Sequence, residues 1–362
     1  MQRFALETLR ALDTRLADPA AAVDLTVLVP PDAEPDASFS NIAIVRCGRR
    51  TGYDWEQIDL RFASGRRILV SPCNSGPLFK RNQIPVIHDT VVLDHPEWFD
   101  EHFVRQCSRV LPWLCRWSKR IVTVSEFSRG RISATTGVST AKIDVVPNGV
   151  SASFAPPSPA AVAAMRSALS LDRPYVLTVG SIEPRKNLVG LLAAWRRVES
   201  SFPDHELVVA GGKDSIFAAT ATEAPPPRAR LLGYVDDGLL PALYGAADVF
   251  AYPSLYEGFG LPPVEAMACG VPVITSRATA MEEICGPAAT YFDPSDPASI
   301  ALALTTALHG GDGRARSSAA GRARAASYTW DRTAAGILAA IGAVAGEGAQ
   351  VDLSAGRAVT GG

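Results

Sequence analysis

Short apolar runs that end in polar residues alternate with amphipathic stretches along most of the chain. Residues 4–16 place Ala5, Leu9, Leu12 and Leu16 at helical spacing, which predicts an amphipathic helix. Six β-branched runs in the first half are expected as strands: 24–30, 41–47, 67–72, 84–89, 120–128 and 142–150. Strands separated by helical stretches predict a parallel sheet covered on both faces.

The pattern restarts after residues 151–173, which are rich in Pro, Ala and Ser and are predicted to be a linker with a short helix. Strands are expected at 174–181, 205–212, 229–235, 248–254 and 271–276, and helices at 187–200 and 237–247. Two consecutive βα arrays predict an α/β protein with two Rossmann-like domains facing a cleft. Ligands of such sheets bind beyond the carboxyl ends of the strands, so the polar strand ends should line that cleft.

Composition excludes several classes of protein. Hydrophobic residues make up 47% of the chain and the net charge is −2, so no nucleic-acid partner is expected. No apolar run approaches the roughly 18 residues that span a bilayer, and Glu7 and Asp13 near the start do not fit a secretory signal. The six cysteines form no C-x-x-C pair, which argues against zinc and favours reduced thiols in a cytoplasmic protein.

The stretch YEGFGLPPVEAMACG carries two carboxylates, Glu257 and Glu265, around a glycine-rich turn. Gly258 and Gly260 permit unusual backbone angles, and the helix is expected to begin between Pro262 and Glu265. A helix N-terminus attracts anions, but two carboxylates would repel a bare phosphate. Vicinal hydroxyls, which donate to carboxylates, fit better. Alternatively, Glu265 only complements the helix dipole and Glu257 is a solvated loop residue.

A second motif, GSIEPRKN, places Arg185 and Lys186 between a predicted strand that ends at Gly180 and Ser181 and a helix capped by Asn187. Adjacent cations beside a helix N-terminus can form a diphosphate site, although a solvated basic loop is the alternative. The chain contains no D-x-D pair to clamp a metal on a nucleotide. Fixed cations are therefore expected to replace a metal ion, and neither a metal nor a cofactor is predicted.

These two motifs, together with LGYVDDGLLPALYGAADVFAYPS, resemble the retaining GT-B glycosyltransferases of family 4, in which the two glutamates form the E-x7-E motif. The resemblance is dense over residues 174–285 and looser through IPVIHD, VTVSEFSR and VVPNGV. Residues 328–341 look like the family's last helix, which returns to the N-terminal domain. The implied domains are an acceptor-side domain (1–155), a linker (156–173), a nucleotide-sugar domain (174–327), a crossover helix (328–343) and a disordered tail (344–362).

The resemblance implies roles for individual residues. Glu265 would hold the ribose hydroxyls of a nucleotide, Glu257 would lie near the donor sugar, and Arg185 and Lys186 would stabilise the departing diphosphate. The implied donor-binding residues are Gly180, Ser181, Tyr234, Val235, Gly258, Phe259, Gly260 and Glu265. The acceptor would attack from the face that the leaving group vacates, so the anomeric configuration would be retained.

On the acceptor side, the resemblance implies that His88 contacts the sugar, and that Ser125 and Asn148 occupy family positions of less defined role. The expected catalytic residues are therefore Glu257, Arg185, Lys186 and His88. A strand-end histidine with a purely structural role is the alternative.

The region from residue 71 to 99 looks most like bacterial mannosyltransferases of exopolysaccharide and lipopolysaccharide assembly, which use GDP-mannose and a glycan or polyprenyl-diphosphate-linked acceptor. Enzymes that use UDP-hexoses share these motifs. Two hypotheses from different functional classes also stay open, namely a nucleotide-sugar 2-epimerase of the same fold and an inactive binding homologue.

Basic residues alternate with aromatic and aliphatic residues in segment 103–120, which is expected to lie against the inner, anionic face of the cell membrane. An ordinary packed helix with a solvated basic face is the alternative, and Pro112 is expected to interrupt the helix.

The beginning of the chain departs from the family pattern. Members of the family begin with a β-strand and a glycine-rich loop, whereas MQRFALETLRALD looks like the helix that follows them. We therefore expect the neighbouring strands to lack a ladder partner. The favoured explanation is that the start of the sequence is assigned downstream of the true N-terminus. The alternative is an N-terminal domain that is itself reduced.

Overall fold

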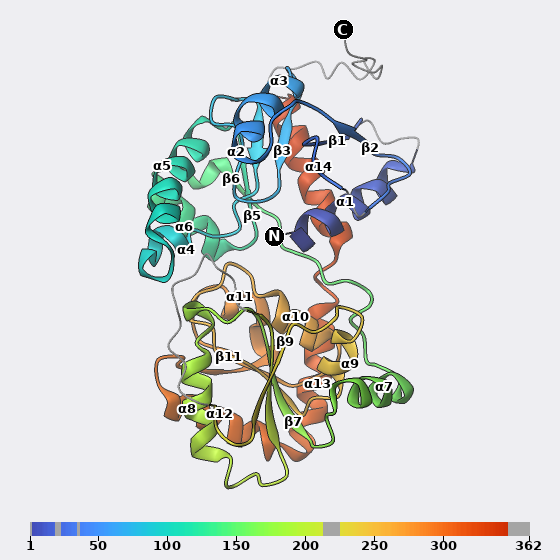
Figure 1. Ribbon diagram of the computed structural model, residues 1–362, viewed down its shortest axis with the longest axis vertical. Helices are drawn as coiled ribbons and strands as arrows, with labels where there is room; N and C mark the ends of the chain where they lie inside the picture. Colours follow the sequence, from blue (N-terminus) through green and yellow to red (C-terminus); the bar gives the residue numbers. More distant parts are fainter. Residues whose placement is uncertain (1, 19–22, 35–36, 213–224, 347–362) are drawn as a thin grey trace.

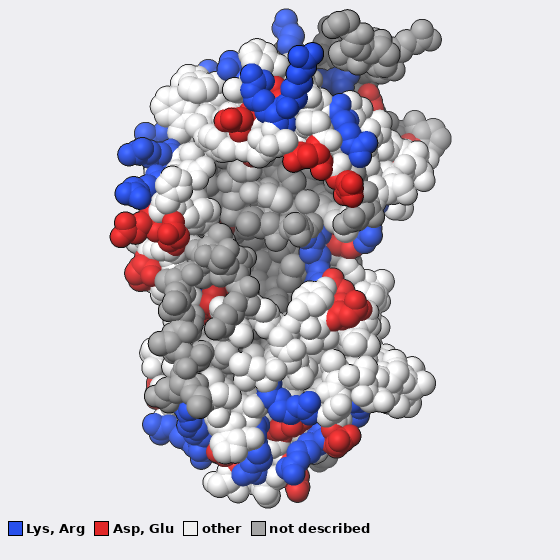
Figure 2. Space-filling model, viewed as in Figure 1, with Lys and Arg blue, Asp and Glu red and all other residues white. Residues whose placement is uncertain are grey.

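The computed structural model describes residues 2–18, 23–34, 37–212 and 225–346. The chain forms two α/β domains, with the N-terminal domain at the top of Figure 1 and the C-terminal domain below it. Figure 2 shows that the surface is hollowed between them. The predicted tail falls outside the described residues, apart from 344–346, which are the end of a helix.

The strands of the N-terminal domain pair in parallel, as the pattern predicts, but each is short. The pairs are β1 (Thr26–Val29) with β2 (Ala43–Arg46), β3 (Leu69–Ser71) with β4 (Gln83–Pro85), and β5 (Ile121–Thr123) with β6 (Ile143–Val145). A bridge between Val86 and Val122 connects β4 to β5. The expected strand at 120–128 is too long because Ser125 caps helix α6 (Glu126–Thr136), its side chain accepting a hydrogen bond from the Ser128 amide.

Among the described residues, no ladder joins β1 or β2 to β3 or β4. Helices α1 (Gln2–Leu16) and α14 (Trp330–Gly346) pack against each other beside these strands (Figure 1). Phe4, Leu12, Ile84, Val122 and Trp330 belong to the apolar core that they share.

The C-terminal domain contains one parallel sheet in the order β12-β11-β10-β7-β8-β9. Its strands are β7 (Tyr175–Val179), β8 (Glu206–Ala210), β9 (Ala229–Gly233), β10 (Val249–Tyr252), β11 (Val273–Ser276) and β12 (Ala289–Phe292). Helices α8 (Leu188–Val198) and α12 (Pro297–Leu308) cover one face, and helices α9 (Leu240–Gly245) and α10 (Leu261–Ala268) cover the other. The chain changes direction across the sheet between β7 and β10, the position at which ligands bind in open α/β sheets.

The crossover helix is confirmed. Helix α14 lies against the N-terminal domain, where the Thr333 hydroxyl donates to the carbonyl of Pro147 at 2.7 Å. A Cβ atom on Gly336 would lie 2.7 Å from the Val146 side chain, so glycine permits this close packing.

The expected interruption at Pro112 is wrong, because helix α5 runs unbroken from Glu101 to Trp117. Buried Leu111, Leu114 and Cys115 hold the helix in the domain core, and this packing offsets the amide hydrogen bond that proline lacks. No helix in the described part of the chain is long and apolar enough to cross a bilayer.

The remaining elements are short or peripheral. They are α2 (Gly52–Asp54), the π-helical turn Trp55–Leu60, α3 (Arg61–Ala63), α4 (Val91–Asp94), α7 (Pro159–Leu169), α11 (Met281–Cys285) and α13 (Gly311–Ala325), with short 3-10 turns at Pro96–Trp98, Thr140–Lys142, Pro184–Lys186 and Gly286–Ala288. Helix α7 lies in the predicted linker and packs on α9.

Candidate active site

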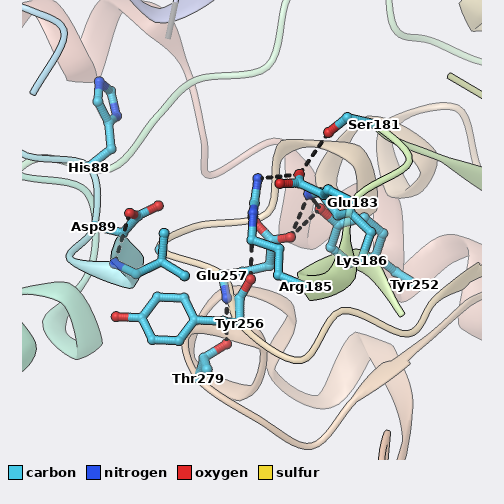
Figure 3. Close-up of polar contacts among 12 residues, drawn as sticks. His88, Asp89, Ser181, Glu183, Arg185, Lys186, Tyr252, Tyr256, Glu257 and Thr279 are labelled. Carbon is cyan, nitrogen blue, oxygen red and sulfur yellow. Dashed lines mark hydrogen bonds and ion pairs between the residues drawn. The ribbon is translucent and has the colours of Figure 1, made fainter. Parts of the chain in front are cut away.

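The two motifs meet at the point where the strand order reverses. The loop after β7 carries Arg185 and Lys186, and the loop after β10 carries Glu257 (Figure 3). The amide of Leu255 donates to the carbonyl of Arg185 at 2.7 Å, which ties the two loops together. Asn187 caps α8 as predicted, with its side chain accepting from the Gly190 amide.

Glu257 is buried and fully partnered. Its carboxylate lies 2.5 Å from Lys186 Nζ and 3.0 Å from Arg185 Nη1, and it accepts a hydrogen bond from the Tyr252 hydroxyl at 2.8 Å. Burial alone would raise the pKa of Glu257, but the charges of Arg185 and Lys186 outweigh burial and lower it to about 2. The alternative of a solvated loop residue is therefore wrong for Glu257.

Arg185 lies between two carboxylates, those of Glu257 and Glu183, and its Nη2 is 2.9 Å from Glu183. Glu183 is 1% exposed and also accepts from the Ser181 hydroxyl at 2.7 Å. Glu183 belongs to the GSIEPRKN motif, but the sequence indicates no role for it. Because the cations are buried and paired, the alternative of a solvated basic loop is also wrong.

A cavity of about 20 Å³ opens beside this cluster. It is lined by Gly180, Ser181, Lys186 and Tyr252, among others. The structure thus brings together the strand end, the cation and the tyrosine that donates to Glu257.

Glu265 lies in α10, and its side chain is 4% exposed. One carboxylate oxygen accepts from the Tyr244 hydroxyl at 3.0 Å, and the other lies 2.5 Å from Arg3 Nη1 of helix α1. Burial raises the pKa of Glu265, and the positive charge of Arg3 partly offsets that effect. Neither Arg3 nor Tyr244 could be singled out from the sequence, because no local motif connects them to Glu265.

The two glycines of the turn are required for different reasons. Gly260 has a φ of 87° and immediately precedes α10, which begins at Leu261, one residue before the predicted range. Gly258 lies so close to the N-terminal domain that a Cβ atom would be 2.4 Å from the His88 carbonyl oxygen. Between them, Phe259 is buried against the ring of Tyr328, at 5.4 Å between centroids.

His88 lies in the N-terminal domain, and Figure 3 shows its ring directed away from the cluster of Glu257 and its two paired cations. The Nε2 atom of His88 lies 2.9 Å from the carbonyl oxygen of Pro72, so Nε2 is the protonated nitrogen in the neutral ring and Nδ1 is left as an acceptor. Burial lowers the pKa of His88 to about 4, which keeps the ring neutral near pH 7. The neighbouring Asp89 points toward Arg185, and burial raises the pKa of its carboxyl group (Figure 3).

The remaining predicted site residues differ in burial and in the contacts that they make. The buried Ser125 hydroxyl donates to the Gly258 carbonyl at 2.6 Å and so joins the two domains. Asn148 is buried in the loop between β6 and α7, and its Oδ1 has no hydrogen-bond partner. Tyr234 follows Gly233 with 78% of its surface exposed, whereas Val235 packs into the domain core.

The described residues contain no group of three or more His, Cys, Asp or Glu side chains arranged to hold a metal ion. Metal independence of the reaction stays a prediction.

Comparisons with known proteins agree with this architecture. The model of the family "Glycosyl transferases group 1" matches residues 164–324, and that of "Glycosyltransferase Family 4" matches residues 71–154. The chain is 34% identical over 254 residues to O-antigen chain mannosyltransferase B of Escherichia coli, covering 68% of this chain and 67% of that protein. It is 30% identical over 257 residues to the glycogen synthase of Mycobacterium tuberculosis, covering 69% and 60%.

Among solved structures, sucrose-phosphate synthase from Thermosynechococcus elongatus superimposes with a TM-score of 0.70 at 20% identity, covering 94% of this chain and 93% of that chain. Two Rossmann-like domains and a returning helix define the GT-B fold. The chain belongs to the glycosyl transferases of group 1, family 4.

Proposed function

We propose that this glycosyltransferase moves mannose from GDP-mannose, with retention of the anomeric configuration and without a metal ion, to a lipid-linked or surface-polysaccharide acceptor. The 34% identity to an O-antigen chain mannosyltransferase carries the proposal of mannose transfer. The buried E-x7-E pair and its cations supply the chemistry.

In this proposal Glu265 accepts hydrogen bonds from the ribose hydroxyls, and Arg185 and Lys186 bind the diphosphate. Their charges are already balanced by Glu183 and Glu257. Donor binding therefore has to redistribute these contacts. The N-terminus of α10, where Leu261 but neither Pro262 nor Pro263 carries an amide hydrogen, supplies further stabilisation of negative charge.

As the bond to the leaving group breaks, negative charge grows on the diphosphate and the sugar becomes oxocarbenium-like. Preorganised cations stabilise that charge without solvent reorganisation. In this proposal the neutral His88 and the carboxylate of Glu257 contact the sugar from opposite domains. The departing phosphate takes the proton of the acceptor hydroxyl, which places the new bond on the face that the leaving group vacates.

The test is product analysis with GDP-mannose, UDP-glucose and other UDP-hexoses, with and without a polyprenyl-diphosphate-linked glycan. We expect transfer from GDP-mannose, only with acceptor present, and an unchanged anomeric configuration by NMR. Preferential use of a UDP-sugar would overturn the assignment of GDP-mannose as the donor. Conversion of the donor without acceptor would indicate an epimerase, and the absence of turnover would indicate a binding homologue.

We also propose that the N-terminal domain contacts an anionic membrane surface, since four exposed aromatic side chains gather there: Phe62, Phe79, Trp113 and Trp117. We call this cluster the aromatic patch. Trp113 stacks on Trp117 at 5.3 Å and meets Phe79 at 6.3 Å. Figure 2 shows Lys and Arg side chains projecting from the same upper and left-hand edge of the domain, near α3 and α5.

Replacing Arg109, Arg116 and Lys119 by glutamine should weaken binding to phosphatidylserine vesicles. Each basic side chain near such a surface contributes about 1 kcal/mol, so we expect a loss of roughly two orders of magnitude in partitioning at low salt. The difference should shrink at high salt. Co-sedimentation measures it, and the matched variant with Arg196, Arg197 and Arg316 of the C-terminal domain replaced should bind normally. Unchanged binding of the first variant would support an ordinary packed helix.

A further inference from the structure

Arg3 connects the first helix of the N-terminal domain to the nucleotide side of the C-terminal domain. Its Nη1 lies 2.5 Å from the Glu265 carboxylate and its Nη2 lies 3.1 Å from Asp237. Its guanidinium also lies over the ring of Phe154, 5.8 Å from the centroid. The Arg3 side chain therefore contacts two carboxylates that lie 234 and 262 positions further along the sequence.

Packing fixes the position of Arg3. The adjacent Phe4 is 2% exposed and meets the rings of His88 at 4.7 Å and Trp330 at 6.1 Å. At the other end of α1, Arg15 donates two hydrogen bonds to Asp331 of α14, at 2.7 and 2.8 Å. Helix α1 is thus anchored at both ends, and Arg3 projects from it into the space between the domains.

The contacts of Glu265 leave part of its hydrogen-bonding capacity unused. A carboxylate offers about four acceptor positions. Tyr244 uses one on one oxygen and Arg3 uses one on the other. Two positions are left, one on each oxygen, which matches the two donors of a vicinal diol.

We propose that Arg3 is a positioning residue of the nucleotide site, which holds Glu265 across the cleft so that its two free acceptor positions face the ribose hydroxyls. This inference rests on the proposed function, in which Glu265 binds ribose. It makes helix α1 part of the donor site and links nucleotide binding to the approach of the two domains.

The role of Arg3 should be visible in the pH dependence of binding. The titratable and charged groups that face Glu265 are Arg3 of α1, Asp237 before α9, Tyr244 of α9 and Cys269 at the end of α10. Among these groups Arg3 supplies the positive charge, which favours the ionised form of Glu265. The negative charge of Asp237 favours the protonated form of Glu265. Without Arg3, Glu265 should take up a proton at a higher pH, and the protonated acid accepts fewer hydrogen bonds from a diol.

The experiment measures binding of GDP, UDP and their 2′-deoxy forms by calorimetry, from about pH 5.5 to about pH 8.5. We expect Arg3→Ala to weaken binding of the ribose forms about tenfold at the acidic end, with partial recovery at the alkaline end. Binding of the 2′-deoxy forms should change less. Arg3→Lys should restore part of the affinity, because the charge is kept.

Two variants separate the possible failures. Arg15→Ala disturbs the docking of α1 without touching the site and should bind like the wild type, whereas Glu265→Gln should lose affinity at every pH. Equal losses for Arg3→Ala and Arg15→Ala, independent of pH, would overturn the positioning role, as would tighter binding by Arg3→Ala. If Glu265→Gln binds normally, the ribose assignment itself fails and the inference fails with it.

Discussion

Replacing Lys186 by alanine should lower kcat about 100- to 1000-fold with a much smaller change in KM. Lys186 Nζ lies 2.5 Å from Glu257 and 2.6 Å from the Tyr252 hydroxyl, so its position is fixed before the donor arrives. The negative charge it meets grows as the diphosphate departs, and an interaction that strengthens in the transition state raises kcat rather than affinity. Steady-state kinetics with the donor identified by product analysis measure the effect.

Two controls accompany this variant. Lys142 is also partly buried, but its Nζ donates to the carbonyls of Cys115 and Arg116, far from the site, so Lys142→Ala should leave kcat unchanged. Wild-type activity should survive a chelator, because Arg185 and Lys186 are expected to do what a metal does in other transferases. An increase in KM at constant kcat would mean that Lys186 binds donor and transition state equally. Strict dependence on added Mg²⁺ would contradict the metal-free mechanism.

Strand positions and domain order could be predicted because short apolar runs bounded by polar residues are local signals. The C-terminal domain follows the prediction closely, from the strand at Tyr175 to that at Ser276. Strand lengths in the N-terminal domain could not be predicted, because Ser125 can continue a strand or cap a helix. The unbroken α5 likewise depends on tertiary packing around Pro112, which no local pattern reports.

The site shows the same division between local and long-range information. Glu257, Arg185 and Lys186 lie in motifs whose residue types indicate their chemistry, and the structure brings them into contact. Arg3 and Tyr244 reach Glu265 from other elements, and at the sequence level each is an ordinary helical residue. Glu183 lies between these two cases. The sequence identifies the motif that contains it, but not its burial between Arg185 and Ser181.

Glu257→Gln should destabilise the C-terminal domain by about 3–5 kcal/mol, the usual cost of breaking a buried ion pair by removing one partner. Glutamine keeps the shape of the side chain, but it leaves Arg185 paired with Glu183 and removes the carboxylate that pairs with Lys186. Chemical denaturation followed by tryptophan fluorescence measures the loss. Glu282→Gln is the matched control, because Glu282 pairs with Arg277 at 2.8 Å while both side chains are more than half exposed. Such a pair contributes about 0–1 kcal/mol.

The pH dependence of stability should separate the charge of Glu257 from its shape. Its pKa is lowered to about 2 in the folded protein, so its contribution is present above the unfolded pKa near 4.5 and is lost as the pH falls toward 2. The wild type and Glu257→Gln should therefore differ most near neutral pH and converge in acid. Parallel curves would mean that packing, rather than charge, explains the loss.

A double variant decides whether the ion pair itself carries this stability. Lys186→Met keeps most of the side-chain volume and removes the positive charge, so Glu257→Gln combined with Lys186→Met leaves no uncompensated charge between the two positions. Because a buried pair costs desolvation that its attraction must offset, removing both charges should cost less than the sum of the single changes. A double variant as unstable as that sum would show that Glu257 and Lys186 act independently. In that case the ion pair that stabilises Glu257 would be the one with Arg185, whose Nη1 lies 3.0 Å from the other carboxylate oxygen of Glu257.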